Sequence, residues 1–314
     1  MAARPVAKEN DKINATMNAI LWSDIENNWD SFTEVTDGFS GADRRIGAIS
    51  SGEKIFVKRA TSEATKTRLQ KEIAVYRILE GHKFASSARL LAVAGDKTGL
   101  ALEALVEEDG WEWSTVWTRE RLAMTLEAMD ALATLELTRE EKDFFTVDAI
   151  DEVDEAWVED YIEKGFIDAL HQRIRKQGHM DTVADIDFAA LAARARVYTF
   201  HNVDLVHNDV RRDNCAWNPQ LGKVRLIDWD WAQIGDRRVD VNSMLVNAYK
   251  GGIDVVHEFR SRVDTDALAW LANYWFKSAA TPIWNGGNDE LRDFQLDSAV
   301  SAYEMLGRCT DSKS

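Results

Sequence analysis

The spacing of apolar residues changes near residues 107–110, and this change limits what the chain can fold into more than any other feature. Before it, short apolar runs at Ile55–Val57, Leu90–Val93 and Gly99–Leu105 are typical of strands, and one helical stretch, Ser62–Glu80, ends at Gly81. After it, apolar residues recur every three or four positions, which is the period of a helix. The spacing therefore predicts an α+β protein, with a small sheet and a covering helix in residues 1–105 and a mainly helical part in residues 106–314.

The same periodicities place the remaining elements. Further strands are predicted within Phe32–Ile49, around a turn that contains Gly38 and Gly41, and at Glu53–Arg59, Asp204–His207 and Val224–Ile227. Further helices are predicted at Ile13–Asn28, around Leu122–Ala133, Ile150–Tyr161 and Phe188–Ala195, and at Val241–Tyr249, Asp266–Lys277 and Glu290–Leu306.

The charge of the chain excludes some partners. Lys and Arg number 38 and Asp and Glu number 54, which gives a net charge of −16 and argues against nucleic acid or an anionic membrane as the main partner. Most of that charge lies in Glu140–Glu163, which holds eleven acids and one base. This segment is either a solvated helix face or a wall that attracts a cationic substrate.

Cysteine use and the N-terminus indicate the compartment. Two cysteines, Cys215 and Cys309, cannot form a disulfide framework, so a reducing environment is expected. The N-terminal residues lack the apolar core of a signal peptide, and the longest nearly apolar run, Ala88–Gly95, is too short to cross a bilayer. We therefore expect a soluble, cytoplasmic protein.

Polar side chains gather around the two late predicted strands. His207 ends one strand, Asp209 follows on a loop, Asn214 comes five residues later, and Asp228 ends the next strand. Asn and Asp supply hard oxygen ligands that suit Mg²⁺, and a separate Asp can accept a hydroxyl proton. The order His-x-Asp-x₄-Asn followed by Asp is the phosphoryl-transfer pattern of protein-kinase-like enzymes.

In these residues the chain resembles the aminoglycoside phosphotransferase family, over roughly Phe32–Asn247. The resemblance implies a two-lobed protein-kinase-like fold that binds ATP, with GTP as the alternative, together with Mg²⁺. Asp209 then acts on the acceptor hydroxyl and Arg211 stabilises the transferred charge, unless it only pairs with nearby acids. The same resemblance makes Asn214 and Asp228 the metal ligands.

The resemblance also implies nucleotide-binding positions upstream. Lys58, in Ile-Phe-Val-Lys, would hold the α- and β-phosphates, and Glu72 on the next helix would pair with it, with Glu63 as the rival. The loop Asp37–Gly41, through Ser40 and Gly41, would cover the phosphates. Backbone groups of Leu102–Leu105, at Glu103 and Leu105, would contact the base.

Four residues near the catalytic motif are expected to be structural. His207 should hold the loop by hydrogen bonds, and Trp229 should pack in the core. Asp236 and Asp240 should also be structural, with Asp240 capping the helix Val241–Tyr249.

The acceptor is expected to be a small molecule. Seven residues separate Asp228 from Asp236, and no Ala-Pro-Glu follows, so the long activation segment of protein kinases is absent from the sequence. The acidic segment favours a cationic acceptor, such as an aminoglycoside-like antibiotic or an amino-alcohol. Aromatic faces can hold such cations, and the candidates flank both ends of the helical part: Trp111, Trp113, Trp117, Trp270, Trp275 and Trp284.

Three other functions remain open. The chain could be a kinase-fold protein that binds a ligand without turnover. It could be a choline-, sugar- or macrolide-type kinase. It could also be an atypical protein kinase, against which the short segment after Asp228 argues.

Overall fold

The computed structural model describes residues 20–36, 41–113, 116–145, 157–183, 185–282 and 289–311. The chain divides into two compact units, which are described separately below. The first comprises residues 1–77 and 89–104, and the second comprises residues 78–88 and 105–314.

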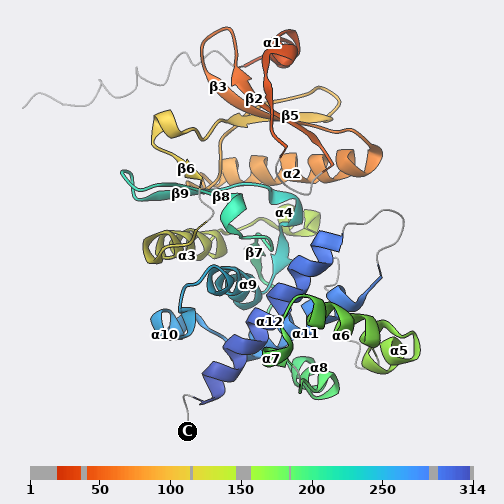
Figure 1. Ribbon diagram of the computed structural model, residues 1–314. Helices are drawn as coiled ribbons and strands as arrows, with labels where there is room; N and C mark the ends of the chain where they lie inside the picture. The colour runs from red at the N-terminus through yellow and green to blue at the C-terminus, as the bar shows by residue number, and fades with distance from the viewer. Residues whose placement is uncertain are drawn as a thin grey trace, which may run out of the picture. The chain divides into compact units, whose positions relative to one another are not determined.

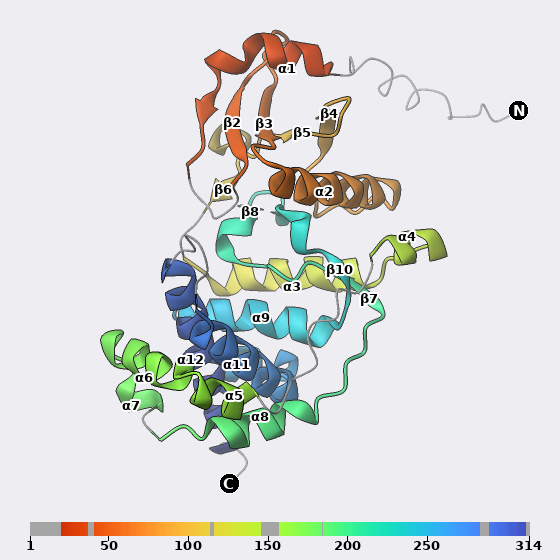
Figure 2. The same cartoon turned by 90° about the vertical axis from the view of Figure 1, so that its right-hand side faces the viewer.

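The first unit is built on a sheet of five antiparallel strands in the order β1-β2-β3-β5-β4. On one face, Ile25 of α1 packs with Ile55 and Val57 of β3, and all three are fully buried. Helix α2 lies along the opposite face (Figures 1 and 2). The elements are α1 (Trp22–Asn28), η2 (Trp29–Ser31), β1 (Thr33–Glu34), β2 (Asp43–Ala48), β3 (Lys54–Arg59), α2 (Glu63–Gly81), β4 (Leu90–Val93) and β5 (Gly99–Glu103), and the last four residues of α2 belong to the second unit.

The strand predictions for this unit are confirmed, and the helix predictions hold with altered bounds. The strands expected at Phe32–Ile49 and Glu53–Arg59 form β1, β2 and β3. Gly81, expected just beyond the helix, is its last residue. Helix α1 begins only at Trp22, and the earlier part of the expected Ile13–Asn28 helix, up to residue 19, lies outside the described residues.

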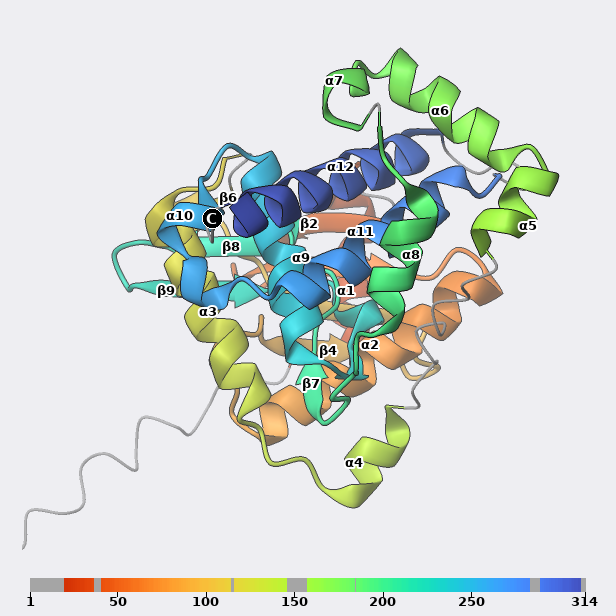
Figure 3. The same ribbon diagram turned by 90° about the horizontal axis from the view of Figure 1, so that it is seen from below.

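The second unit consists mainly of helices around two small antiparallel sheets, β10-β7 and β6-β8-β9. Helices α11 and α12 run side by side, with α8 packed on α11 (Figure 3). Helices α3 and α9 lie next to each other and next to β7 (Figure 2). The helices are α3 (Arg119–Ala133), α4 (Arg139–Phe144), α5 (Trp157–Glu163), α6 (Phe166–Lys176), α7 (Met180–Val183), α8 (Phe188–Arg196), α9 (Arg237–Lys250), α10 (Val255–Glu258), α11 (Thr265–Ala280) and α12 (Asp289–Asp311).

Short strands and turns complete this unit, and they carry the polar motif. The strands are β6 (Glu112–Trp113), β7 (Asp204–Val206), β8 (Cys215–Asn218), β9 (Lys223–Leu226) and β10 (Gln233–Gly235), with single helical turns η3 (Glu107–Asp109), η4 (Arg212–Asn214), η5 (Trp229–Trp231) and η6 (Arg260–Arg262). Strand β8 was not predicted, because all four of its residues are buried and it shows no alternation. It forms a hairpin with β9. No helix in the described ranges is long and apolar enough to cross a membrane.

Candidate functional site

Lys58 and Glu72 form a buried ion pair inside the first unit. Lys58 lies on β3 and points to the face opposite Ile55 and Val57, because side chains alternate along a strand. Its Nζ lies 2.9 Å and 3.0 Å from the two carboxylate oxygens of Glu72 on α2. The residues are 5% and 2% exposed, so the pair is shielded from solvent. The rival Glu63 is instead paired with Lys66 at the exposed start of α2.

Of the other four expected nucleotide-binding positions, the structure describes three. Ser40, with the rest of 37–40, lies outside the described residues. The carbonyl of Gly41 accepts a hydrogen bond from the Thr61 hydroxyl at 2.5 Å, which ties the start of β2 to the end of β3. Glu103 ends β5, where its side chain accepts from the Arg89 N–H at 3.0 Å. Leu105 opens the second unit, and its carbonyl accepts from the Trp113 indole at 2.7 Å.

His207 shapes the loop that carries Asp209, as expected of a structural residue. Its Nε2–H donates to the Ile227 carbonyl at 2.9 Å, and its Nδ1 accepts from the Asp209 N–H at 3.3 Å. Burial lowers the pKa of the His207 ring to about 4, so the ring is neutral and can play both roles. The imidazole also packs against Trp229, which is fully buried as predicted.

The expectation that Asp240 caps a helix is wrong. Helix α9 starts four residues earlier than predicted, and Asp236 is its N-cap, accepting from the Arg238 N–H. Asp240 lies inside the helix, where its carboxylate accepts from the backbone N–H groups of His207 at 3.0 Å and Asn208 at 2.9 Å. Burial raises the pKa of Asp240 to about 6, although these two hydrogen bonds oppose the rise. Asp240 thus fixes the start of the loop that carries Asp209.

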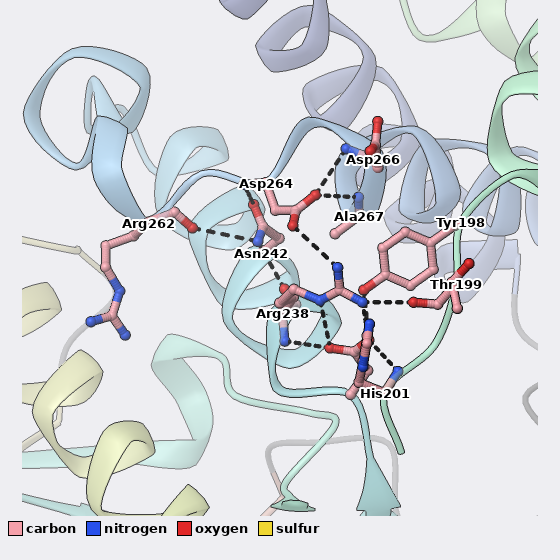
Figure 4. A network of polar contacts seen from close by, with 10 residues as sticks. Tyr198, Thr199, His201, Arg238, Asn242, Arg262, Asp264, Asp266 and Ala267 are labelled. Carbon is pink, nitrogen blue, oxygen red and sulfur yellow. Dashed lines mark hydrogen bonds and ion pairs between the residues drawn. The ribbon is translucent and has the colours of Figure 1, made fainter. Parts of the chain in front are cut away.

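Asp236 holds a second network next to this loop. Its carboxylate accepts from the Tyr198 hydroxyl and from the His201 N–H, both at 2.8 Å, and it pairs with Arg238 at 2.7 Å. Figure 4 shows Arg238 beside the Tyr198 ring and facing Asp264, which caps α11. The network ties the chain before β7 to α9 and α11, and it is structural, as expected for Asp236.

Asp209 and Asn214 are held together by direct contacts. The Asn214 amide donates to both the carbonyl and the carboxylate of Asp209, at 2.8 Å and 2.9 Å. Burial raises the pKa of the Asp209 carboxyl to about 7; the Arg211 charge opposes this rise, and the negative charge of Asp228 adds to it. The Arg211 Nε lies 2.8 Å from an Asp209 oxygen, and another nitrogen lies 3.3 Å from Asp213. Arg211 is therefore an ion-pair partner of the loop acids and is also close to the expected reaction centre.

Asn214 and Asp228 form a donor set that fits Mg²⁺. The Ile227 N–H bonds to the Asn214 backbone carbonyl at 3.1 Å, which brings Asp228 beside Asn214. Asp228 has left-handed backbone angles, φ 66° and ψ 62°, which are uncommon outside glycine and typical of sharp functional turns. The Asn214 nitrogen is used by Asp209, so its amide oxygen is the atom left for a ligand. Within the described residues no group of three or more His, Cys, Asp or Glu could hold a metal, but Mg²⁺ needs only one or two protein groups beside phosphates.

The tryptophans proposed as an aromatic cage are mostly core residues. Trp111, Trp117 and Trp270 are buried, and Trp275 is partly buried against the cluster around Trp270. Trp113 is 45% exposed, and Trp284 lies outside the described residues. Among the five candidates that the structure describes, Trp113 is thus the most exposed.

The described acids of Glu140–Glu163 have local partners in several cases. Glu141 completes a capping box at the start of α4 and contacts His82 at 3.1 Å. Asp143 lies near Arg139, and Asp160 pairs with Lys164 at 2.6 Å. Residues 146–156 of this segment lie outside the described residues.

Comparison with known proteins identifies the family. The model of the phosphotransferase enzyme family matches residues 31–277, well over half of the chain, so the protein belongs to this family. It is thus a phosphotransferase, and its two-lobed α+β fold is protein-kinase-like. The comparison with curated protein sequences gives no match.

The solved structures that the chain is similar to are distant in sequence. The GDP and kanamycin complex of the aminoglycoside phosphotransferase APH(2'')-IIIa is 15% identical, with a TM-score of 0.50 and coverage of 93% of this chain and 99% of that one. An ethanolamine kinase of Plasmodium vivax is 10% identical, with a TM-score of 0.49 and coverage of 86% and 83%. The choline kinase LicA of Streptococcus pneumoniae is 13% identical, with a TM-score of 0.45 and coverage of 92% and 97%.

Proposed function

We propose that this protein transfers the γ-phosphoryl group of Mg·ATP, with GTP as the alternative donor, to a hydroxyl of a small molecule. The observation that carries the proposal is the loop in which Asp209 is bonded to Asn214 and Asp228 is held beside it. The buried Lys58–Glu72 pair of the first unit supports it, because a fixed ammonium group suits nucleotide phosphates.

Asp209 orients the acceptor hydroxyl and takes up its proton as the hydroxyl oxygen bonds to the γ-phosphorus. The bond from that phosphorus to the β–γ bridging oxygen breaks, and the nucleoside diphosphate leaves. Arg211, 2.8 Å from Asp209, places positive charge where the transferred group becomes more negative. The neutral His207 ring holds the Asp209 backbone in place during this step.

Mg²⁺, bound by Asn214 and Asp228, would neutralise phosphate charge. The crowding of Asp209, Asp213, Asp228 and Asp230 supports such an ion, because their mutual repulsion falls when a cation binds.

The acceptor is proposed to include a cationic group, as in an amino-alcohol or an aminoglycoside-like antibiotic. The net charge of −16 supports this part of the proposal. Glu159 and Glu163, both exposed on α5, are the described acids to test, because neither forms an ion pair in the described part of the chain. Substituting both with Gln should raise the KM for a cationic acceptor more than the KM for ATP.

The central experiment compares Asp209→Ala with Asp213→Ala. Both substitutions remove one carboxylate from the same loop, but Asp213 is exposed. Asp209→Ala should abolish phosphoryl transfer to an acceptor while ATP binding, measured by calorimetry, stays nearly unchanged. Asp213→Ala should retain most turnover. Equal loss of turnover and of ATP binding in Asp209→Ala would contradict the role given to Asp209.

A binding function without turnover is the alternative. It is favoured if the wild-type protein binds an acceptor tightly yet transfers no phosphate across amines, aminoglycosides, macrolides and sugars. Transfer to a protein substrate rather than to alcohols would instead indicate an atypical protein kinase.

A further inference from the structure

A group of cationic side chains surrounds one aromatic ring beside the catalytic loop. The ring is Phe294 on α12, with the Lys250 Nζ 4.3 Å from its centroid and the Arg211 guanidinium carbon 5.4 Å away. Arg211 contacts Asp209, so the Phe294 ring lies next to the proposed reaction centre. All these residues belong to the second unit.

Arg212 adds a third cation to this group, and it has no carboxylate partner among the described residues. Its backbone N–H bonds to the Asn247 side chain on α9 at 3.4 Å, which holds its position in the loop. Its side chain is only partly exposed. A half-buried guanidinium without a carboxylate keeps most of its donors available.

Lys250 shares its carboxylate partner with a histidine. It ends α9, and its Nζ pairs with Asp297 at 3.1 Å, but Asp297 is shared with His179, whose Nε2 lies 2.9 Å from it. Burial lowers the pKa of Lys250; Asp297 opposes this, while the charges of Arg212 and Arg211 lower it further. Lys250 and Arg211 both lie against the Phe294 ring, and the Arg212 backbone is held at Asn247, three residues before Lys250 on α9. The three cations are therefore neighbours, and an anion bound among them would reduce their mutual repulsion.

One member of this group has no carboxylate partner. Arg211 pairs with Asp209 and Asp213, and Lys250 pairs with Asp297, but Arg212 forms no ion pair within the described ranges. In a chain with a net charge of −16, a half-buried guanidinium without its own acid beside the catalytic loop can take a different counter-charge. The nucleotide phosphates are assigned to Lys58 and the metal ligands, so the acceptor is the remaining source.

We propose that Arg212 and Lys250 bind an acidic group, a carboxylate or a phosphate, carried by the acceptor in addition to its hydroxyl. This inference rests on the proposed kinase function and deepens it. The Phe294 ring gives the same subsite an apolar wall between the acidic group and the hydroxyl. The acceptor class is then a hydroxylated acid, such as a sugar acid, a sugar phosphate or a hydroxy amino acid. A hydroxy amino acid also carries the cationic amine that the overall charge of the protein favours.

The first test measures binding without turnover. Inorganic phosphate is titrated at constant ionic strength into the full-length protein, with thermal stabilisation as the readout. The variants are Arg212→Gln, Lys250→Met, Lys58→Met and the matched control Lys223→Gln. Lys223 is an exposed cation at the far end of the β8–β9 hairpin, four strand residues or about 13 Å from Asn214.

Phosphate should stabilise the wild type, Lys58→Met and Lys223→Gln alike. Its affinity should fall about tenfold or more in Arg212→Gln, because a charge-assisted hydrogen bond is lost. Lys250→Met should show the same loss; if it fails to fold, Arg212→Gln decides alone. Equal stabilisation of wild type and Arg212→Gln, or no stabilisation of the wild type, overturns the proposal.

The second test uses matched acceptors with Mg·ATP: glucose, glucosamine, glucuronate and glucose 6-phosphate. The acidic members should have a higher kcat/KM than neutral glucose, and Arg212→Gln should remove this preference while Lys223→Gln keeps it; glucosamine reports separately on the proposed cationic group. Transfer to glucose that equals or exceeds transfer to both acidic sugars would overturn the acidic subsite and leave the kinase function standing. Phosphate binding that depends on Arg212, without transfer to any acceptor, would support the subsite and count against the kinase function.

Discussion

Removing one partner of the Lys58–Glu72 pair should be far more costly than removing both. The two side chains meet across β3 and α2 with water excluded, at 2.9 Å and 3.0 Å. An unpaired charge left in such a place costs about 3–5 kcal/mol, whereas replacing a buried pair by apolar residues is often neutral or stabilising. Lys58→Met and Glu72→Leu should thus each destabilise the first unit by about 3–5 kcal/mol, and the double variant should be near the wild type.

Hydrogen exchange of the β3 and α2 amides is the suitable assay, because it reports on the first unit alone. Each 1.4 kcal/mol corresponds to tenfold in the opening equilibrium, so either single variant should exchange roughly two to three and a half orders of magnitude faster. The control is Lys66→Met, which breaks an exposed pair with Glu63 and should change exchange by less than about fivefold. A double variant as unstable as the sum of the singles would refute the reasoning. All variants lacking Lys58 should lose turnover whatever their stability.

Three further predictions concern the second unit. Asp240→Asn leaves one side-chain oxygen for the two backbone N–H donors of the loop that carries Asp209. In steady-state kinetics, kcat should fall about 10- to 100-fold with little change in the KM for ATP. An unchanged kcat would show that the loop does not depend on Asp240. Asn273→Leu leaves the buried Trp157 indole N–H without its acceptor at 3.0 Å and should cost about 1–3 kcal/mol in urea unfolding, whereas Trp157→Phe/Asn273→Leu should recover part of the loss. The hydrogen bond from Arg262, with a smaller one from Arg237, lowers the pKa of Asp130 below its ordinary value of 3.8, although burial opposes this shift. The ionised carboxylate therefore stabilises the fold above pH 3.8, and this contribution disappears as the pH falls through the pKa of the folded state. Asp130→Asn should make the urea midpoint less dependent on pH at acid pH, and an unchanged dependence would contradict this prediction.

Local patterns predicted most of the fold. The strands β3 and β5 and the helices α2, α9, α11 and α12 each follow a clear period, and their bounds differ from the predictions by a few residues. Strand β8 was missed because a fully buried strand has no polar face to alternate with. Helix α6 was missed, although Ile167, Leu170 and Ile174 have the three- and four-residue spacing that indicates a helix.

The candidate site, like the fold, could be predicted from the sequence only in part. The Lys58–Glu72 contact could be predicted, because a family motif fixes both positions. The role of Asp240 could not, because Asp is a favoured N-cap residue and Asp240 directly precedes the predicted helix Val241–Tyr249. Its actual role depends on a contact with backbone groups 32 and 33 residues away. The grouping of Arg212, Lys250 and Phe294 likewise arises only when α9 and α12 pack beside the loop.

Helix α9 carries residues that position both ends of the proposed acceptor site. Asp240 holds the backbone before Asp209, Asn247 holds Arg212, and Lys250 ends the same helix, about 15 Å along the axis from Asp240 at 1.5 Å per residue. Under the proposal made above, the separation between the acceptor hydroxyl and its acidic group is set by helical rise rather than by loop sequence. Inserting one residue between Asn247 and Lys250 would turn the lysine by about 100° and change which acceptors fit, with every catalytic residue left in place.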